Sequence, residues 1–157
     1  MASFTTALSA SRICPLSEEE RSTTGFSHKF TILYSDVAIA SASGATDDVT
    51  VSFGSTPAKW LVDKALANVK TAFAGTTALT VEVGTTSSVA AFVSSTSVLT
   101  AGAIKMVSTV PVLTNATATA AVTLQAKFTN ATGGSPSALT AGQLDVYLRL
   151  LDADKLP

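Results

Sequence analysis

The chain has 157 residues, a formal net charge of −1 and 13% charged residues, against a hydrophobic share of 46%. This length suits one domain whose core is large enough to fold without disulfides or metal. The ten basic residues form no stripe, which argues against a nucleic-acid partner, because such binding needs clustered Lys and Arg. No run approaches the roughly 20 apolar residues of a membrane helix, so we expect no membrane partner either.

Few residues could carry chemistry. Cys14 is the single cysteine and His28 the single histidine, so the chain offers no internal disulfide and no His/Cys metal-ligand spacing. The same scarcity excludes most nucleophile–base pairs. We therefore expect a protein that is not an enzyme and that uses no metal and no cofactor.

Residues 1–28 differ from the rest, because charge gathers at 18–21 and apolar residues are widely spaced. Ser17, before three glutamates, is a capping signal for a single helical turn. We predict an extended N-terminal arm at 1–28 and a single domain at 29–157. The arm is either a disordered tail or a segment that packs on a neighbouring subunit or partner. In the second case, the contacts would be made by its apolar residues, Phe4, Leu8, Ile13 and Leu16.

The segments that follow alternate apolar and polar residues, with the period of a strand that buries one face. We predict strands at 30–42 (with a kink at Ser35-Asp36), 49–53, 79–83, 103–112, 116–128 and 143–151. Turn signals separate most of them, and 130–142 is a loop by composition. Many short strands predict an all-β chain, an antiparallel β-sandwich with little helix.

Residues 57–74 carry conflicting signals. Thr56 and Pro57 mark a helix start, and four apolar residues recur at every fourth position, Leu61, Ala65, Val69 and Phe73. The alternative is a strand at 60–69 followed by a helical turn at 70–73. Local propensity favours the helix.

The stretch 79–104 begins with a strand, and we predict a corner at Val83-Gly84. Phe92 is expected to anchor the segment that then folds back over the sheet. These three residues are therefore assigned a structural role. Two runs rich in Ser and Thr are candidates for subunit contact, 85–88 and 94–97.

The order of the segments resembles a group of small virion proteins of tailed bacteriophages, of the capsid decoration (cement) or head-fibre type. The resemblance covers roughly residues 30–152. It rests on VKTAFAG before the strand LTVEVG, on the aromatic in FVSSTSVLTAGAI, on the long strand AVTLQAKFTN, and on the closing pattern from Thr140 to Leu148. It implies a β-sandwich or jelly roll, and it favours the strand for 60–69.

The resemblance also implies a function. Such proteins sit over junctions between major capsid subunits, as trimers or other small oligomers. We therefore expect a decoration protein of the capsid exterior, assembled in the host cytoplasm, whose partners are the major capsid protein and itself as a homotrimer. The alternative is a tail or fibre module, or a carbohydrate-binding β-sandwich, which would need an exposed aromatic platform. Trp60 alone is more typical of a core or an interface.

Overall fold

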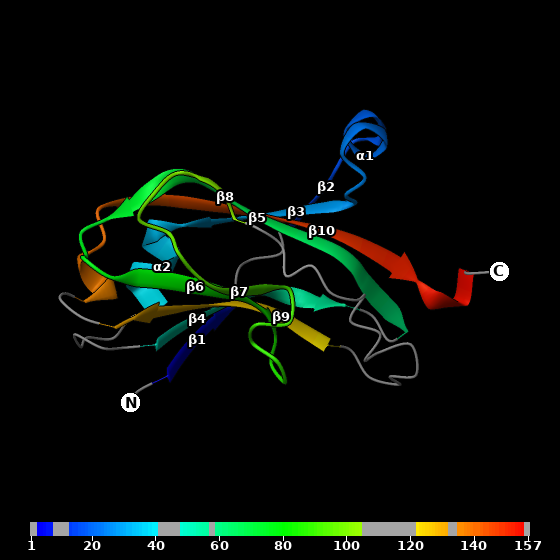
Figure 1. The fold of residues 1–157 in the computed structure, drawn as a ribbon. Coiled ribbons are helices and arrows are strands. Elements are labelled where there is room, and N and C mark those ends of the chain that lie inside the picture. The colour runs from blue at the N-terminus through cyan, green and yellow to red at the C-terminus, as the bar shows by residue number, and fades with distance from the viewer. Residues whose placement is uncertain are drawn as a thin grey trace.

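A computed structural model of the chain describes residues 3–7, 13–40, 48–56, 59–104, 122–131 and 135–155. Strands dominate them and form two five-stranded sheets that lie face to face as two layers (Figure 1). The strands are β1 (Ser3–Ala7), β2 (Ile13–Pro15), β3 (His28–Leu33), β4 (Asp48–Thr56), β5 (Trp60–Ala74), β6 (Leu79–Thr85), β7 (Val93–Ser97), β8 (Gly102–Ile104), β9 (Val122–Asn130) and β10 (Ala141–Asp152). The helices are α1 (Glu18–Thr24) and α2 (Tyr34–Ala40), with 3₁₀ turns at Pro136–Ala138 and Ala153–Lys155.

The chain passes repeatedly from one sheet to the other. Sheet A has the strand order β1-β4-β9-β6-β7, and sheet B has the order β2-β3-β10-β5-β8. Neighbouring strands are antiparallel, except that β1 pairs with β4 in parallel. The prediction of an all-β chain with little helix is confirmed.

The core lies between the layers and follows from the alternation of the sequence. Every second residue of β4, β9 and β10 is buried, namely Val49, Val51, Phe53, Leu124, Ala126, Phe128, Leu144, Val146 and Leu148. Two aromatic pairs join the layers, because each takes one ring from either sheet. The ring centroids of Phe30 and Phe53 are 4.7 Å apart, and those of Phe73 and Phe128 are 5.6 Å apart.

The segment with both helix and strand signals forms the strand β5 over Trp60–Ala74, as the resemblance implied for 60–69. β5 pairs with β10 along its length, from Trp60 opposite Asp152 to Ala74 opposite Ala141. The helical turn expected at 70–73 is wrong, because these residues stay in the strand and Phe73 donates its N–H to the Val98 carbonyl at 3.0 Å. A spacing of four residues fits one face of a helix, but it is also even, so it fits one face of a strand. All four apolar residues at that spacing are buried, Leu61, Ala65, Val69 and Phe73.

The strand expected at 30–42 is wrong in its second half. β3 ends at Leu33 and α2 begins at Tyr34. The carboxylate of Asp36 accepts a hydrogen bond from the Leu33 N–H at 2.8 Å, which satisfies a donor that the first helical turn would leave free. Val37 is fully buried and holds the helix on the core. The expected kink at Ser35-Asp36 is therefore the first turn of a helix.

The remaining strand predictions agree with the structure where it describes them. The segments 49–53, 79–83 and 143–151 lie within β4, β6 and β10. For 103–112 the structure describes only the start, in β8, and for 116–128 only the part that begins β9 at Val122. The other residues of these two segments lie outside the described ranges.

Candidate interaction surface

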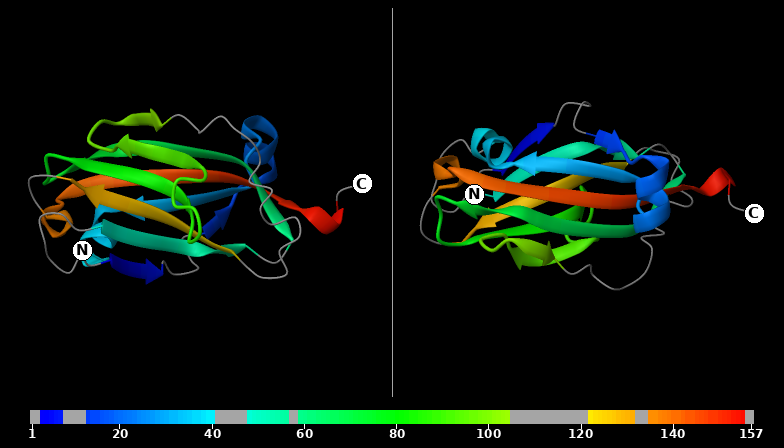
Figure 2. Two further views of the ribbon diagram at one scale, coloured as in Figure 1. Left: turned by 60° about the horizontal axis from the view of Figure 1, so that its bottom comes forward. Right: turned by 90° about the horizontal axis from the view of Figure 1, so that it is seen from above.

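The N-terminal segment lies along the edges of both sheets. β1 is an edge strand of sheet A, with Phe4 opposite Val49, and β2 is an edge strand of sheet B, with Ile13 opposite Phe30. Both edges are on the same side of the molecule, beside β4 and β3 (Figure 2). The domain boundary at residue 28 stays a prediction, and strands from both sides of it contribute to the two sheets.

The four apolar residues proposed for the arm differ in what the structure shows of them. Leu16 is buried in its own chain, with 7% of its surface exposed, and its N–H donates to the Ser27 carbonyl at 3.0 Å. Phe4 and Ile13 lie in edge strands, but their side chains are not among those described, and Leu8 lies outside the described residues. Contact of these residues with a partner stays a prediction.

α1 begins at the capping signal that the sequence predicts. The Glu20 N–H donates to Ser17 Oγ at 3.3 Å, and the Ser17 N–H donates to the Glu20 carboxylate at 3.0 Å. The carboxylate also accepts a hydrogen bond from Ser17 Oγ at 2.9 Å. The bond from the Ser17 backbone N–H, and then the bond from its side chain, hold the pKa of Glu20 below its ordinary value of 4.5. Gly25 ends the helix with a φ of 73°. No residue of α1 is buried, and the helix stands clear of sheet B (Figure 1).

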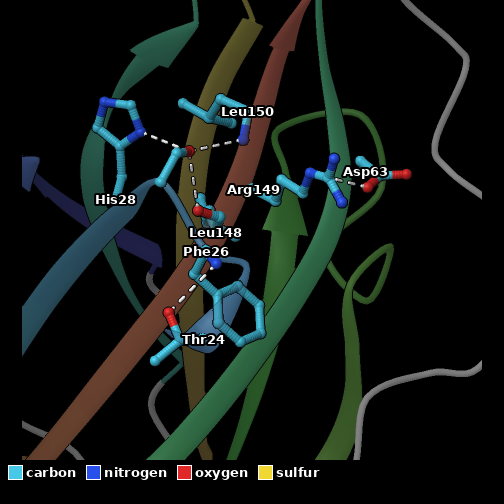
Figure 3. A network of polar contacts seen from close by, with 8 residues as sticks. Thr24, Phe26, His28, Asp63, Leu148, Arg149 and Leu150 are labelled. Atoms are coloured by element: carbon cyan, nitrogen blue, oxygen red, sulfur yellow. Dashed lines mark hydrogen bonds and ion pairs between the residues drawn. The ribbon is translucent and has the colours of Figure 1, made fainter. Parts of the chain in front are cut away.

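Ser27 joins the N-terminal segment to the end of β10 (Figure 3). Its N–H donates to the Leu148 carbonyl at 2.9 Å, and its Oγ accepts the Leu150 N–H at 2.8 Å. The same Oγ lies 3.1 Å from the Leu148 carbonyl oxygen and 2.8 Å from His28 Nδ1. One serine thus makes four polar contacts, which fix where the chain enters β3 relative to β10.

A buried carboxylate stabilises the outer face of sheet B. Asp145 is fully buried, and its Oδ2 forms an ion pair with Lys29 Nζ at 3.0 Å. Its Oδ1 accepts hydrogen bonds from Thr31 Oγ1 at 2.9 Å and from Gln143 Nε2 at 3.1 Å. A buried charge is tolerated when it is paired and hydrogen bonded in this way. The contacts of Asp145 with Lys29 and Thr31 therefore link β10 to β3, and their role is structural.

Aromatic contacts continue this face toward α1. The ring of Phe26 lies 5.9 Å from that of Tyr147, and Lys29 Nζ lies 5.8 Å from the centre of the Tyr147 ring. Beyond them, Arg149 Nε lies 3.4 Å from Asp63 Oδ2, which links β10 to β5 (Figure 3). The N-terminal segment is thus packed on the last strand through rings and through the Ser27 bonds.

We expect His28 to make the fold less stable as the pH falls. Burial, and then the positive charge of Arg21, lower the pKa of His28 below 6.5. At a pH between the two pKa values, the unfolded chain binds a proton on His28 and the folded chain does not. The contribution of neutral His28 to stability is therefore complete above pH 6.5, and it is lost as the pH falls from 6.5 toward the pKa of His28 in the folded chain. The denaturant concentration at the midpoint of unfolding should therefore decrease as the pH is lowered from about 7.5 to about 5.5.

His28→Gln is the control for this pH dependence. The chain has no other histidine, and most carboxylates titrate at lower pH, so the variant should show a flatter midpoint over the same interval. A wild-type midpoint that stays constant or rises on acidification would contradict the prediction.

The corner after β6 lies slightly later than expected. Gly84 is still in the strand and pairs with Gln125, and the chain turns at Thr85–Ser88, where each N–H donates to the other residue's carbonyl at 2.8 and 3.2 Å. A Cβ on Gly84 would overlap the carbonyl groups of Ser88 and Val89. The glycine therefore lets the turn fold tightly back over the strand end.

Phe92 lies at the end of that returning segment. Its N–H donates to the Val83 carbonyl at 2.8 Å, and 5% of its surface is exposed. The segment returns to sheet A, because β7 pairs with β6. Of the two Ser/Thr runs proposed for subunit contact, Thr85 is buried, whereas residues 86–88 and Ser94, Ser95 and Ser97 are exposed. Ser94, Ser95 and Ser97 lie on β7, an edge strand of sheet A.

Across the described residues, no three His, Cys, Asp or Glu side chains are grouped so that they could hold a metal ion. Neither α1 nor α2 has the length and apolar character needed to cross a membrane. In comparisons with known proteins, no family model, no curated protein and no solved structure matches the chain. Its function is therefore inferred from its fold and surface.

Proposed function

We propose that the chain is a structural virion protein, a capsid decoration protein that binds the outer surface of a phage capsid. One observation carries the proposal, the nested pairing of the strands from β3 to β10. The first pairs with the last, and so on inward: β3 with β10, β4 with β9, β5 with β8 and β6 with β7. One long hairpin folded into two facing sheets is a jelly-roll β-sandwich, the fold that we assign. Viral capsid domains are a common use of that fold.

Because a fold alone does not define a function, the surface has to suit the role. The outer face of sheet A is polar with few charges. Asp48 and Lys127 form an ion pair at 2.7 Å, and Glu82 is the register partner of Lys127 on β6. The other outward positions hold hydroxyl and amide groups. Thr80, Thr123 and Thr129 are partly exposed, whereas Thr50, Ser52 and Gln125 are already buried within the chain. Such groups are easier to bury against another protein than charges are.

The proposed mechanism is burial of surface across the seams of the capsid. Each copy would cover a junction between major capsid subunits, so that parting the subunits would also break its contacts and expose apolar surface. We assign self-association as a homotrimer to the exposed edge strand β7, because an edge strand offers backbone groups to a neighbour. The proposal places the protein on the capsid exterior after assembly in the host cytoplasm, and includes no enzymatic activity, metal or cofactor.

Removal of residues 1–12 should abolish binding to capsids while the domain still folds. The cut keeps β2 and every later strand, and it keeps Leu16 and Ser27, which belong to the fold. Co-sedimentation with emptied capsids measures binding, and circular dichroism with light scattering checks the fold and the oligomer. Full-length chain that does not sediment with capsids would refute the proposed function.

A double variant in the full-length chain separates the role of the arm's side chains from that of its length. Phe4→Ser with Leu8→Ser keeps the segment but removes two of its apolar groups, and should weaken binding as strongly as the deletion. Truncated chain that still decorates particles as well as the full-length chain would show that the arm is not the attachment site.

The alternative proposal is a carbohydrate-binding module, for instance in a tail or fibre. It is favoured by the jelly-roll assignment, because lectins also use this fold, and by the partly exposed Trp60. A glycan array decides between the two proposals. Specific glycan binding that Trp60→Ala removes, with no binding to capsids, would establish the alternative.

A further inference from the structure

The outer face of sheet B has apolar side chains at its middle. Tyr147 of β10 lies opposite Leu66 of β5, so both side chains point to the same face. Both are partly exposed, and so is Phe26, whose ring lies 5.9 Å from that of Tyr147. The outer face of sheet A has no such group among the strand positions described above. Aromatic and apolar side chains at the centre of a polar surface are typical of a protein interface.

The same face of sheet B also has an excess of positive charge. Lys29 and Arg149 are already paired with carboxylates, at 3.0 and 3.4 Å between nitrogen and oxygen. Lys64 and Lys70 are exposed and form no ion pair with a described residue. Lys64 lies opposite Arg149, and Lys70 lies six residues further along β5, about 20 Å away. One unpaired cation therefore lies toward each end of the face.

The helix α1 stands on this face at the end that holds Lys64. Seen from above sheet B, it lies over one end of β10 (Figure 2). Its Glu18 and Glu19 are exposed and form no ion pair with a described residue, whereas Glu20 is engaged by Ser17. A helix of this size raises the surface by about 10 Å. The face is therefore a flat sheet with an acidic step at one end and an unpaired lysine toward the other.

This shape and charge are complementary to themselves. A two-fold rotation brings α1 of one copy to the far end of the other copy's sheet, where Lys70 lies, and the reverse contact forms at the same time. Sheets that pack face to face are about 10 Å apart, which matches the height of the step. The helix would therefore lie against the end of the partner's sheet and would not hold the sheets apart. Leu66 and Tyr147 would then lie near the rotation axis and meet their counterparts.

We propose that the outer face of sheet B binds a second copy of this chain as a two-fold dimer, in which Glu18 and Glu19 of each copy pair with Lys70 of the other. The apolar groups at the centre are removed from water, and the charges at the rim fix the orientation. β7, to which the trimer is assigned, belongs to sheet A, so the two contacts do not compete. The inference does not rest on the capsid proposal. This contact alone gives two copies, and together with the trimer it gives six.

Light scattering of the full chain at low ionic strength tests the proposal. The mass should correspond to an even number of copies. Lys70→Glu should halve it, because like charges then face each other, and Glu18→Lys with Glu19→Lys should halve it as well. All three substitutions in one chain should restore the wild-type mass, because each pair forms again with its signs exchanged. A wild-type mass of one or three copies, or an unchanged mass of Lys70→Glu, would overturn the proposal.

A matched control and a salt series separate this contact from general charge effects. Lys155→Glu reverses a cation with 81% of its side chain exposed, beyond the end of β10, and should leave the mass unchanged. Circular dichroism checks that each variant is folded. Between about 0.05 and 1 M NaCl, the dissociation constant of the wild-type contact should rise about tenfold or more, because salt screens rim charges. A constant that does not change with salt, or a folded triple variant that stays at half the mass, would refute the ion pairs.

Discussion

Replacement of Phe92 by Ala should lower the free energy of unfolding by roughly 3–5 kcal/mol, the range found when buried aromatic residues are truncated. Only 5% of Phe92 is exposed, and together with Trp60 and Leu124 it lines a void of about 10 Å³ at the end of the core. The ring therefore fills its site almost completely, so its removal would leave a new cavity, and the cost of truncation increases with the volume of that cavity. Denaturant unfolding, with the slope compared between variants, measures the loss.

Tyr34→Ala is the matched control, because it also truncates an aromatic residue but at a position with 38% of its surface exposed. It should cost about 1 kcal/mol or less. A near-neutral Phe92→Ala would show that the segment between β6 and β7 lies loosely on the surface and does not anchor sheet A.

Gly84→Val should be the second severe change, with a cost on the order of 1–3 kcal/mol or more, as for an overpacked core. The new Cβ would overlap the carbonyl groups of Ser88 and Val89, and backbone atoms cannot rotate aside as a side chain can. The turn at Thr85–Ser88 would have to open, and the following residues would lift from the sheet. Thermal or denaturant unfolding measures the effect.

Gly25→Asn is the control for this glycine. Its φ of 73° is one that Asn tolerates, and no atom lies within 4 Å of a Cβ built there, so the change should be small.

The double variant Gly84→Val with Phe92→Ala should cost less than the sum of the two changes, because the opened turn already releases Phe92. Additive losses would mean that the turn and the ring act separately.

The strands with one buried face could be predicted from sequence because their pattern has a single explanation. In β4, β9 and β10, apolar residues alternate with polar ones, and period two fits only a strand. Residues 60–74 illustrate the opposite case. Their spacing of four residues satisfies helix and strand equally, so the outcome depends on pairing with β10, a segment far along the chain. Local propensity contains no information about such a partner.

The same reasoning explains what was missed in the candidate interaction surface. The capping box at Ser17 and Glu20 is local, and it was visible. The bonds of Ser27 to Leu148 and Leu150 join positions more than a hundred residues apart, and a serine in a polar stretch gives no sign of them. The helix α2 was mistaken for a strand because Val37, which is fully buried, continued an apolar run.

The position of β10 has a consequence for how this protein is made. β10 is the last described strand of the chain, yet it lies in the interior of sheet B, between β3 and β5. Sheet B cannot close until this strand has been synthesised, and the two strands that pair with it, β3 and β5, lie far earlier in the chain. Contacts of such long sequence separation make folding slow, in the range of about milliseconds to seconds for all-β domains. A nascent chain without β10 holds two open strand edges, so chaperone binding during synthesis should be strongest just before this strand emerges.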